Sequence, residues 1–401
     1  MMGLQPLSPA LPREVAPELR SFAETVWRLL ARDGLHAALR MVSRAIRDLE
    51  DVAVISDPSQ GWEARLQAGV SRRAYLLNLR GIVQAQQRDD DAAMADLLDA
   101  TLEAPTWFVP WYNLGLFHKG ARRWQQAHDA LQRALSCCRG RNQDPSRPLL
   151  WNLGIAQTAL SHFGEARATW KLCGLPIQPG PAQSPPDMDL GLAQLSLPTK
   201  GTYAAERVWV QRLDPTRARI LSVVRYGAPC QFGDVVLCDS GEGHTGYWDG
   251  LAMGSEPGDA AGTLRSREPG TGGMVFLDVL ETAGYVLHVV RGAPAAPAQA
   301  TALTERLREA DLHIEVWSLT MRLPDETRSN QAEGGATPLC AGLVIPYNWQ
   351  DPRRSAERAA QELHAVAQEL SLPLYAPTLL EAAGDEIGAA RHRKGLRLQK
   401  W

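Results

Sequence analysis

Residues 109–134 read VPWYNLGLFHKGARRWQQAHDALQRA, and this stretch decides the fold of the first half of the chain. Its order of a large residue, Leu, Gly, Ala, an apolar residue and Ala occurs three times between residues 74 and 173, with a period of ~34 residues and a longer connection before the last copy. The three copies contain Leu77, Gly81, Ala93, Leu97, Ala100 and Pro105; Trp111, Leu114, Gly115, Ala127, Leu131 and Ala134; and Leu150, Leu153, Gly154, Ala166, Trp170 and Cys173.

These positions have a simple physical meaning if each copy is a helical hairpin. The Gly and the first Ala are small, so two helices can approach closely there, while bulky residues fill the space between successive hairpins. One hairpin cannot bury its apolar face alone, whereas stacked hairpins bury a continuous core. The pattern therefore predicts a helical solenoid.

Residues 74–173 resemble the tetratricopeptide repeat family in these offsets. The resemblance implies a groove, lined by the first helix of each hairpin, that holds a peptide or protein segment. The register selects nine residues as candidates for partner binding: Tyr75, Asn78, Tyr112, Asn113, Leu116, Lys119, Trp151, Asn152 and Ile155. Some family members clamp a C-terminal carboxylate with Lys, Arg and Asn. Asn113 fits such a clamp, but Pro148 and Asn152 stand where it needs basic residues.

The helical domain is expected to span residues 14–173. Apolar residues at helical spacing in 14–50 predict a degenerate first repeat that seals the array, and residues 1–13 are Pro-rich and predicted to be loose. The proline-rich segment 174–190 is predicted to be a stiff linker.

Residues 191–401 show alternating apolar patterns typical of strands, followed by two helical stretches, and we recognise no family in them. Asp214-Pro215-Thr216 is expected to turn a hairpin, and a strand, a helix at 297–310 and a further strand suggest a right-handed crossover. The expected fold class is thus multidomain: an α-helical solenoid similar to tetratricopeptide repeats, then an α+β domain with a mixed sheet.

Composition limits the function classes. A net charge of −3 gives no general field for nucleic acid or anionic membrane, so no nucleic acid partner is expected. The sequence has neither a signal peptide pattern nor a long apolar run, and its six scattered cysteines indicate free thiols. We expect a cytoplasmic protein, and the richness in Arg and Ala suggests a bacterial source.

No motif for catalysis or cofactor binding is present, so no catalytic residue, metal or cofactor is predicted. The densest cluster of ligand-type residues contains Cys230, Asp234, Cys238, His244 and Asp249, but its spacing does not match that of structural zinc sites. A Cys–His pair could be assembled from several of these residues, yet no nucleophile signature accompanies it.

The favoured function is a protein interaction adaptor or scaffold. The first alternative is an enzyme whose α+β domain carries the active site while the repeats recruit substrate. The second is a specific chaperone or neutralising protein for one effector. The oligomeric state and the role of the loop at 239–273 stay open.

Overall fold

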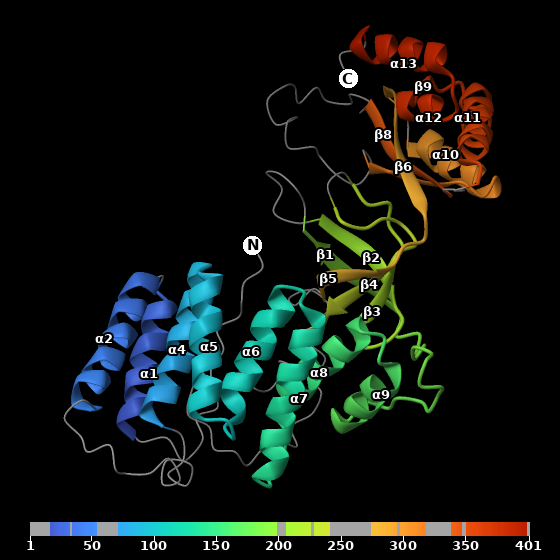
Figure 1. The fold of residues 1–401 in the computed structure, drawn as a ribbon. Coiled ribbons are helices and arrows are strands. Elements are labelled where there is room, and N and C mark those ends of the chain that lie inside the picture. The colour runs from blue at the N-terminus through green and yellow to red at the C-terminus, as the bar shows by residue number, and fades with distance from the viewer. Residues whose placement is uncertain are drawn as a thin grey trace. The chain divides into compact units, whose positions relative to one another are not determined.

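The computed structural model describes residues 17–32, 34–53, 71–198, 206–225, 228–240, 274–294, 297–317, 338–346 and 350–398. They form two units, one ending at Pro186 and one beginning at Asp187 (Figure 1). The loop at 239–273 and the ligand-type residues His244 and Asp249 lie outside the described residues, apart from Asp239 and Ser240. Within the described ranges, no helix is both long and apolar enough to cross a membrane.

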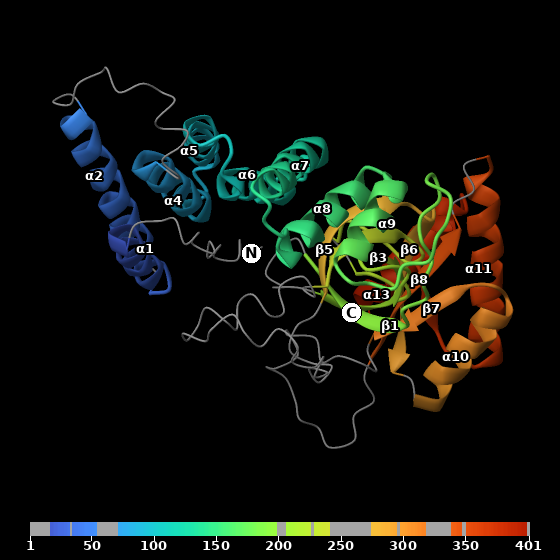
Figure 2. The ribbon, with the colours of Figure 1, turned by 90° about the horizontal axis from the view of Figure 1, so that it is seen from below.

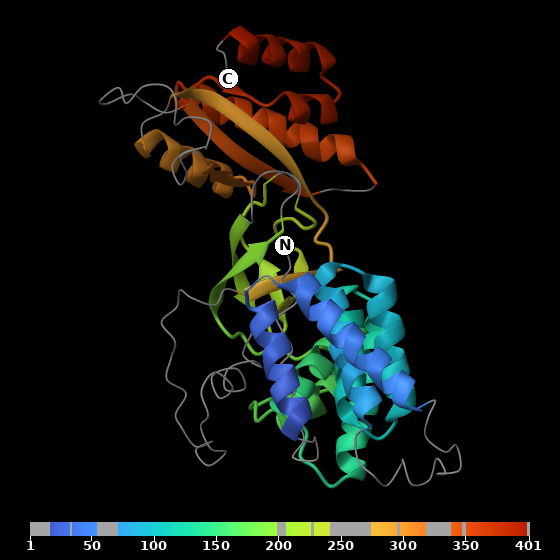
Figure 3. The ribbon, with the colours of Figure 1, turned by 90° about the vertical axis from the view of Figure 1, so that its left-hand side faces the viewer.

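The first unit consists of helical hairpins, which Figure 3 shows as successive pairs of neighbouring helices. The helices are α1 (Pro17–Leu30), α2 (Leu35–Ala53), α4 (Arg72–Gln87), α5 (Asp90–Glu103), α6 (Phe108–Gly120), α7 (Trp124–Gly140), α8 (Arg147–Ala159) and α9 (Phe163–Leu172). The pairs are α1 with α2, α4 with α5, α6 with α7, and α8 with α9.

Each of the last three hairpins is closed by the same close contact. A Cβ atom added at Gly81 would lie 2.8 Å from Leu97 Cγ, and one at Gly115 would lie 2.6 Å from Leu131 Cγ. At Gly154 the distance to the Trp170 ring would be 2.4 Å. Real carbon atoms stay about 3.5 Å or more apart, so the repeated glycine is what lets the two helices meet. This confirms the physical interpretation of the repeat.

The turns of these hairpins repeat as well. Each first helix is followed within two residues by a left-handed residue, with φ of 66° at Arg88, 56° at Arg122 and 60° at Ser161. The N–H of the following residue then donates back into the first helix, as His162 does to the carbonyl of Gln157 at 2.8 Å. Such a left-handed closure satisfies the last carbonyls of a helix. Identical turns at identical offsets make the three hairpins structural copies.

The start of the second unit is a closed five-stranded barrel. Its strands are β1 (Leu192–Leu197), β2 (Glu206–Arg212), β3 (Arg217–Ile220), β4 (Val235–Asp239) and β5 (Met274–Glu281). Neighbours along the chain pair antiparallel, and a parallel pairing of β1 with β5 closes the barrel. As predicted, Asp214 turns the hairpin between β2 and β3, because its carboxylate accepts the N–H groups of Thr216 and Arg217, both at 2.8 Å.

The rest of the second unit is an antiparallel sheet covered by helices on one face (Figures 1 and 2). Its elements are β6 (Tyr285–Pro294), α10 (Pro297–Glu309), β7 (His313–Val316), β8 (Pro338–Pro346), α11 (Pro352–Glu369), β9 (Leu374–Tyr375), α12 (Pro377–Ala382) and α13 (Glu386–Leu398). In the strand order β7-β8-β6-β9, the two strands connected by α10, β6 and β7, are separated by β8. The two strands connected by α11, β8 and β9, are separated by β6. This is the split arrangement of ferredoxin-like folds.

The expectation of one mixed sheet was therefore wrong. The parallel relation between β6 and β7 exists, but β8 lies between them and pairs antiparallel with both. The first five strands close on themselves instead of joining that sheet. Two register shifts in the pairing of β4 with β5, at Val235/Val236 and Leu237/Cys238, bend the barrel wall, and such bulges are what allow a short sheet to curl.

Candidate partner-binding face

The first helices of the three hairpins, α4, α6 and α8, are joined by polar side chains. Asn113 of α6 donates from Nδ2 to Asn78 Oδ1 of α4 at 2.8 Å, and both residues are buried. Lys119 of α6 donates from Nζ to Asn152 Oδ1 of α8 at 2.7 Å. Buried amides need such partners, because an unpaired one costs about 1–3 kcal/mol. These bonds fix the register of one first helix against the next.

Asn152 is the centre of the second of these contacts. Its Nδ2 donates to the carbonyl of Pro148 at 2.8 Å and lies 3.4 Å from the Tyr112 hydroxyl. Tyr112 and Lys119 of α6 are thus both held by one fully buried residue of α8. Side chains held in this way lose little further freedom when they bind a partner.

The structure divides the nine predicted groove residues into two groups. Six of them are buried: Tyr75, Asn78, Asn113, Trp151, Asn152 and Ile155. Tyr75 stacks on Trp107 with a centroid distance of 6.0 Å, and Trp151 meets the edge of Trp170 at 5.1 Å. Their aromatic rings therefore take part in the packing of the hairpins. Whether these residues also contact a partner stays a prediction.

Tyr112, Leu116 and Lys119 form the second group and are partly exposed. They follow one another at spacings of four and three along α6, so they lie in one stripe of that helix. We call these three residues the α6 stripe. The sequence pattern identified its members, but could not separate them from the buried six, because burial depends on contacts between hairpins.

Cys230 and Cys238, the two thiols weighed for nucleophilic chemistry, are both buried. Burial raises the pKa of Cys230 to about 12, and it raises the pKa of Cys138 and of Cys173 to about 11. Cys238 is fully buried in the barrel, and its thiol donates to the Thr216 carbonyl at 3.3 Å. A thiol attacks as thiolate, so these cysteines are not arranged for catalysis.

Asp234, another member of the Cys230 cluster, has structural partners. Asp234 accepts the N–H groups of Gln231 and Ala283, both at 2.7 Å, and so joins the start of β4 to the connection after β5. Another carboxylate of the same unit, that of Glu315, was not among the predicted candidates. Glu315 of β7 accepts the Val223 N–H at 2.8 Å, and burial raises the pKa of Glu315. Both carboxylates organise backbone rather than face a substrate.

No protein-family model matches this chain. No curated protein matches it either. Among solved structures it is similar to two of MamA, one described as an RS-1 ArsTM double mutant and one as MamA 41-end from Desulfovibrio magneticus RS-1. They are 16% and 17% identical to this chain over 40% of its length, cover 94% and 96% of their own, and both have a TM-score of 0.23. At that TM-score the likeness carries no weight, and the helical array rests on the repeated geometry described above.

Proposed function

We propose that the first unit is a protein interaction module that holds a segment of another protein along the α6 stripe. The observation that carries this proposal is that the side chains of the stripe are partly exposed and are already held in place by contacts within the protein. Tyr112 and Lys119 are both tied to the buried Asn152, and Leu116 lies between them on the same face of α6. Tyrosine is one of the residue types enriched in binding hot spots, so Tyr112 is the expected anchor of this stripe.

The chemistry of the stripe indicates what it binds. Tyr112 and Leu116 offer apolar surface to a side chain of the partner, and the Lys119 ammonium places a positive charge beside them. A segment with an apolar side chain next to a carbonyl or carboxylate oxygen matches this pattern. The broader role, as an adaptor or scaffold, follows if the second unit serves another partner.

The test uses the full chain as bait in extracts of its source cells, with a variant that substitutes none of the buried amide residues. Tyr112→Ala combined with Leu116→Ser keeps the bond between Lys119 and Asn152. The matched control is Leu98→Ala combined with Leu102→Ser, because these leucines are 42% and 77% exposed on the second helix α5.

We expect the stripe variant to lose one specific partner by about 30-fold or more, which corresponds to hot-spot losses of about 2 kcal/mol. The α5 control should retain that partner, and both variants should keep the helical circular dichroism of the parent chain. Equal retention of every partner by both variants would remove the stripe from consideration. An alternative function as an enzyme receives no support from the buried, protonated thiols of the described residues.

A further inference from the structure

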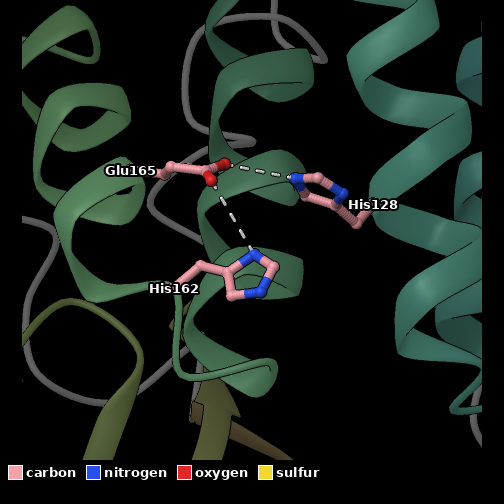
Figure 4. Close-up of side chains that lie close together, drawn as sticks. All are labelled: His128, His162 and Glu165. Carbon is pink, nitrogen blue, oxygen red and sulfur yellow. Dashed lines mark hydrogen bonds and ion pairs between the residues drawn. The ribbon is translucent and has the colours of Figure 1, made fainter. Parts of the chain in front are cut away.

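Three ligand-type side chains meet at the second helices α7 and α9. His128 lies on α7, while His162 is the residue immediately before α9 and Glu165 lies in its first turn. One ligand atom from each residue lies within 4.8 Å of the other two (Figure 4). Figure 4 shows the Glu165 carboxylate directed at both imidazole rings. We call these three residues the α7–α9 cluster.

The distances fit a small divalent cation. His128 Nε2 lies 3.4 Å from Glu165 Oε2, and His162 Nδ1 lies 4.0 Å from Glu165 Oε1. Ligand atoms about 2.0–2.1 Å from a tetrahedral zinc ion stand about 3.3 Å apart. The first distance already matches. The second joins His162 to the other carboxylate oxygen, and the side chains of His162 and Glu165, which are 41% and 54% exposed, can rotate to bring the three ligands to one cation.

The surroundings of His128 are those of a metal ligand. Its other ring nitrogen, Nδ1, lies 3.2 Å from Asp129 Oδ1, and Asp129 in turn accepts a hydrogen bond from Gln125 at 2.9 Å. With the proton on Nδ1 donated to Asp129, the Nε2 lone pair faces Glu165 and is available to a cation. A carboxylate behind a histidine is the usual outer partner of a zinc ligand, and it fixes the ring and raises its basicity.

The carboxylate is held in place too. Gln157 of α8, which is buried, donates from Nε2 to Glu165 Oε2 at 3.3 Å. The cluster thus has supporting contacts behind two of its three ligands. Ordered ligands of this kind distinguish a built site from a chance meeting of exposed charged groups.

We propose that the α7–α9 cluster binds one divalent zinc-class cation, which clips the α6–α7 hairpin to the α8–α9 hairpin. Two imidazoles and one carboxylate favour zinc or its transition-metal neighbours over magnesium and calcium, which prefer oxygen ligands. Water occupies the fourth position. The cation links α7 to α9, and its occupancy therefore sets how rigidly these hairpins are joined.

Zinc titration of the tag-free, chelator-treated full chain by calorimetry tests this proposal. We expect one equivalent of zinc to bind, magnesium not to compete, and the midpoint of thermal unfolding to rise by about 5–10 °C at a 100-fold excess of free zinc over Kd. His128→Ala and Glu165→Gln should each abolish that equivalent and the thermal shift. Asp129→Asn, which touches no cation, should weaken binding by about 10- to 100-fold.

His36→Ala is the matched control, because His36 is an exposed histidine on α2 of the same unit, and it should change nothing. Cobalt spectroscopy gives a second measurement that does not depend on variants. A tetrahedral spectrum without thiolate charge-transfer bands supports ligation by nitrogen and oxygen. The proposal is overturned by no zinc binding, by binding that survives His128→Ala and Glu165→Gln, or by a cobalt–thiolate band that assigns the metal to cysteines.

Discussion

Replacing Gly154 with alanine tests the close contact that defines the repeat. The added Cβ atom would lie 2.4–2.7 Å from three atoms of the Trp170 ring, which is fully buried against Trp151. The ring must retreat by about 1 Å to restore normal contact, and overpacking of this kind costs about 1–3 kcal/mol. Alanine regains about 1 kcal/mol of helix propensity. With the cost at its upper end, we expect a net loss of about 2 kcal/mol.

Gly140 provides the matched control for this change. It is the last residue of α7, and a Cβ atom there would meet nothing within 4 Å. Gly140→Ala should therefore be neutral or stabilising by up to about 1 kcal/mol.

The assay is thermal unfolding followed by helical circular dichroism, where a loss of about 2 kcal/mol lowers the midpoint by about 4–8 °C. A double-mutant cycle with Trp170→Leu should recover part of the loss, because the smaller side chain makes room for the new methyl group. If Gly154→Ala raises the midpoint as Gly140→Ala does, helix propensity alone governs this position and the close contact is not the basis of the repeat.

Three further predictions concern the turns, the buried histidine and the thiols. Ser161→Gly should stabilise the α8–α9 hairpin by about 0.5–1 kcal/mol because φ is 60° there, while Ser161→Val should destabilise it. Chemical denaturation measures both changes, and equal midpoints would contradict the strained turn. Burial lowers the pKa of His288 to about 4, so its contribution to stability is present above about pH 6.5 and is lost as the pH falls towards 4. By pH 5 the loss is about 2 kcal/mol, and hydrogen exchange of β6 should show it in the parent chain but not in His288→Leu. Cys230 should resist alkylation at pH 8 in the folded chain and react in urea, as mass spectrometry would detect; rapid labelling without urea would show that its thiol is not held protonated.

The helical half could be predicted because its fold is encoded in local, repeated spacing. Gly81, Gly115 and Gly154 recur in phase with the alanines that pack beside them, and the structure places all three glycines at helix contacts. Exposure within the groove could not be predicted in the same way. Asn78 and Asn113 are buried where two hairpins meet, and the repeat register does not report how closely neighbouring hairpins pack.

The second half shows how little an alternating pattern of apolar and polar residues reveals about strand pairing. An alternating pattern predicts a strand, but it does not identify the strand's partner, and the pairing of β1 with β5 joins residues about 80 positions apart in the chain. The two-residue strand β9 is too short for any pattern. The α7–α9 cluster could not be predicted from the sequence for a similar reason, because only His162 and Glu165 are close in sequence and His128 comes from the preceding repeat.

The most direct test of the central proposal is site-specific photo-crosslinking in the source cells, with the photoreactive residue placed at position 116 or at position 102. Leu116 belongs to the α6 stripe, whereas Leu102 is the most exposed large apolar residue among those of the described chain and lies on α5. We predict that position 116 captures one specific protein and position 102 does not. Capture of the same proteins from both positions, or of a specific protein only from position 102, would contradict binding along the α6 stripe.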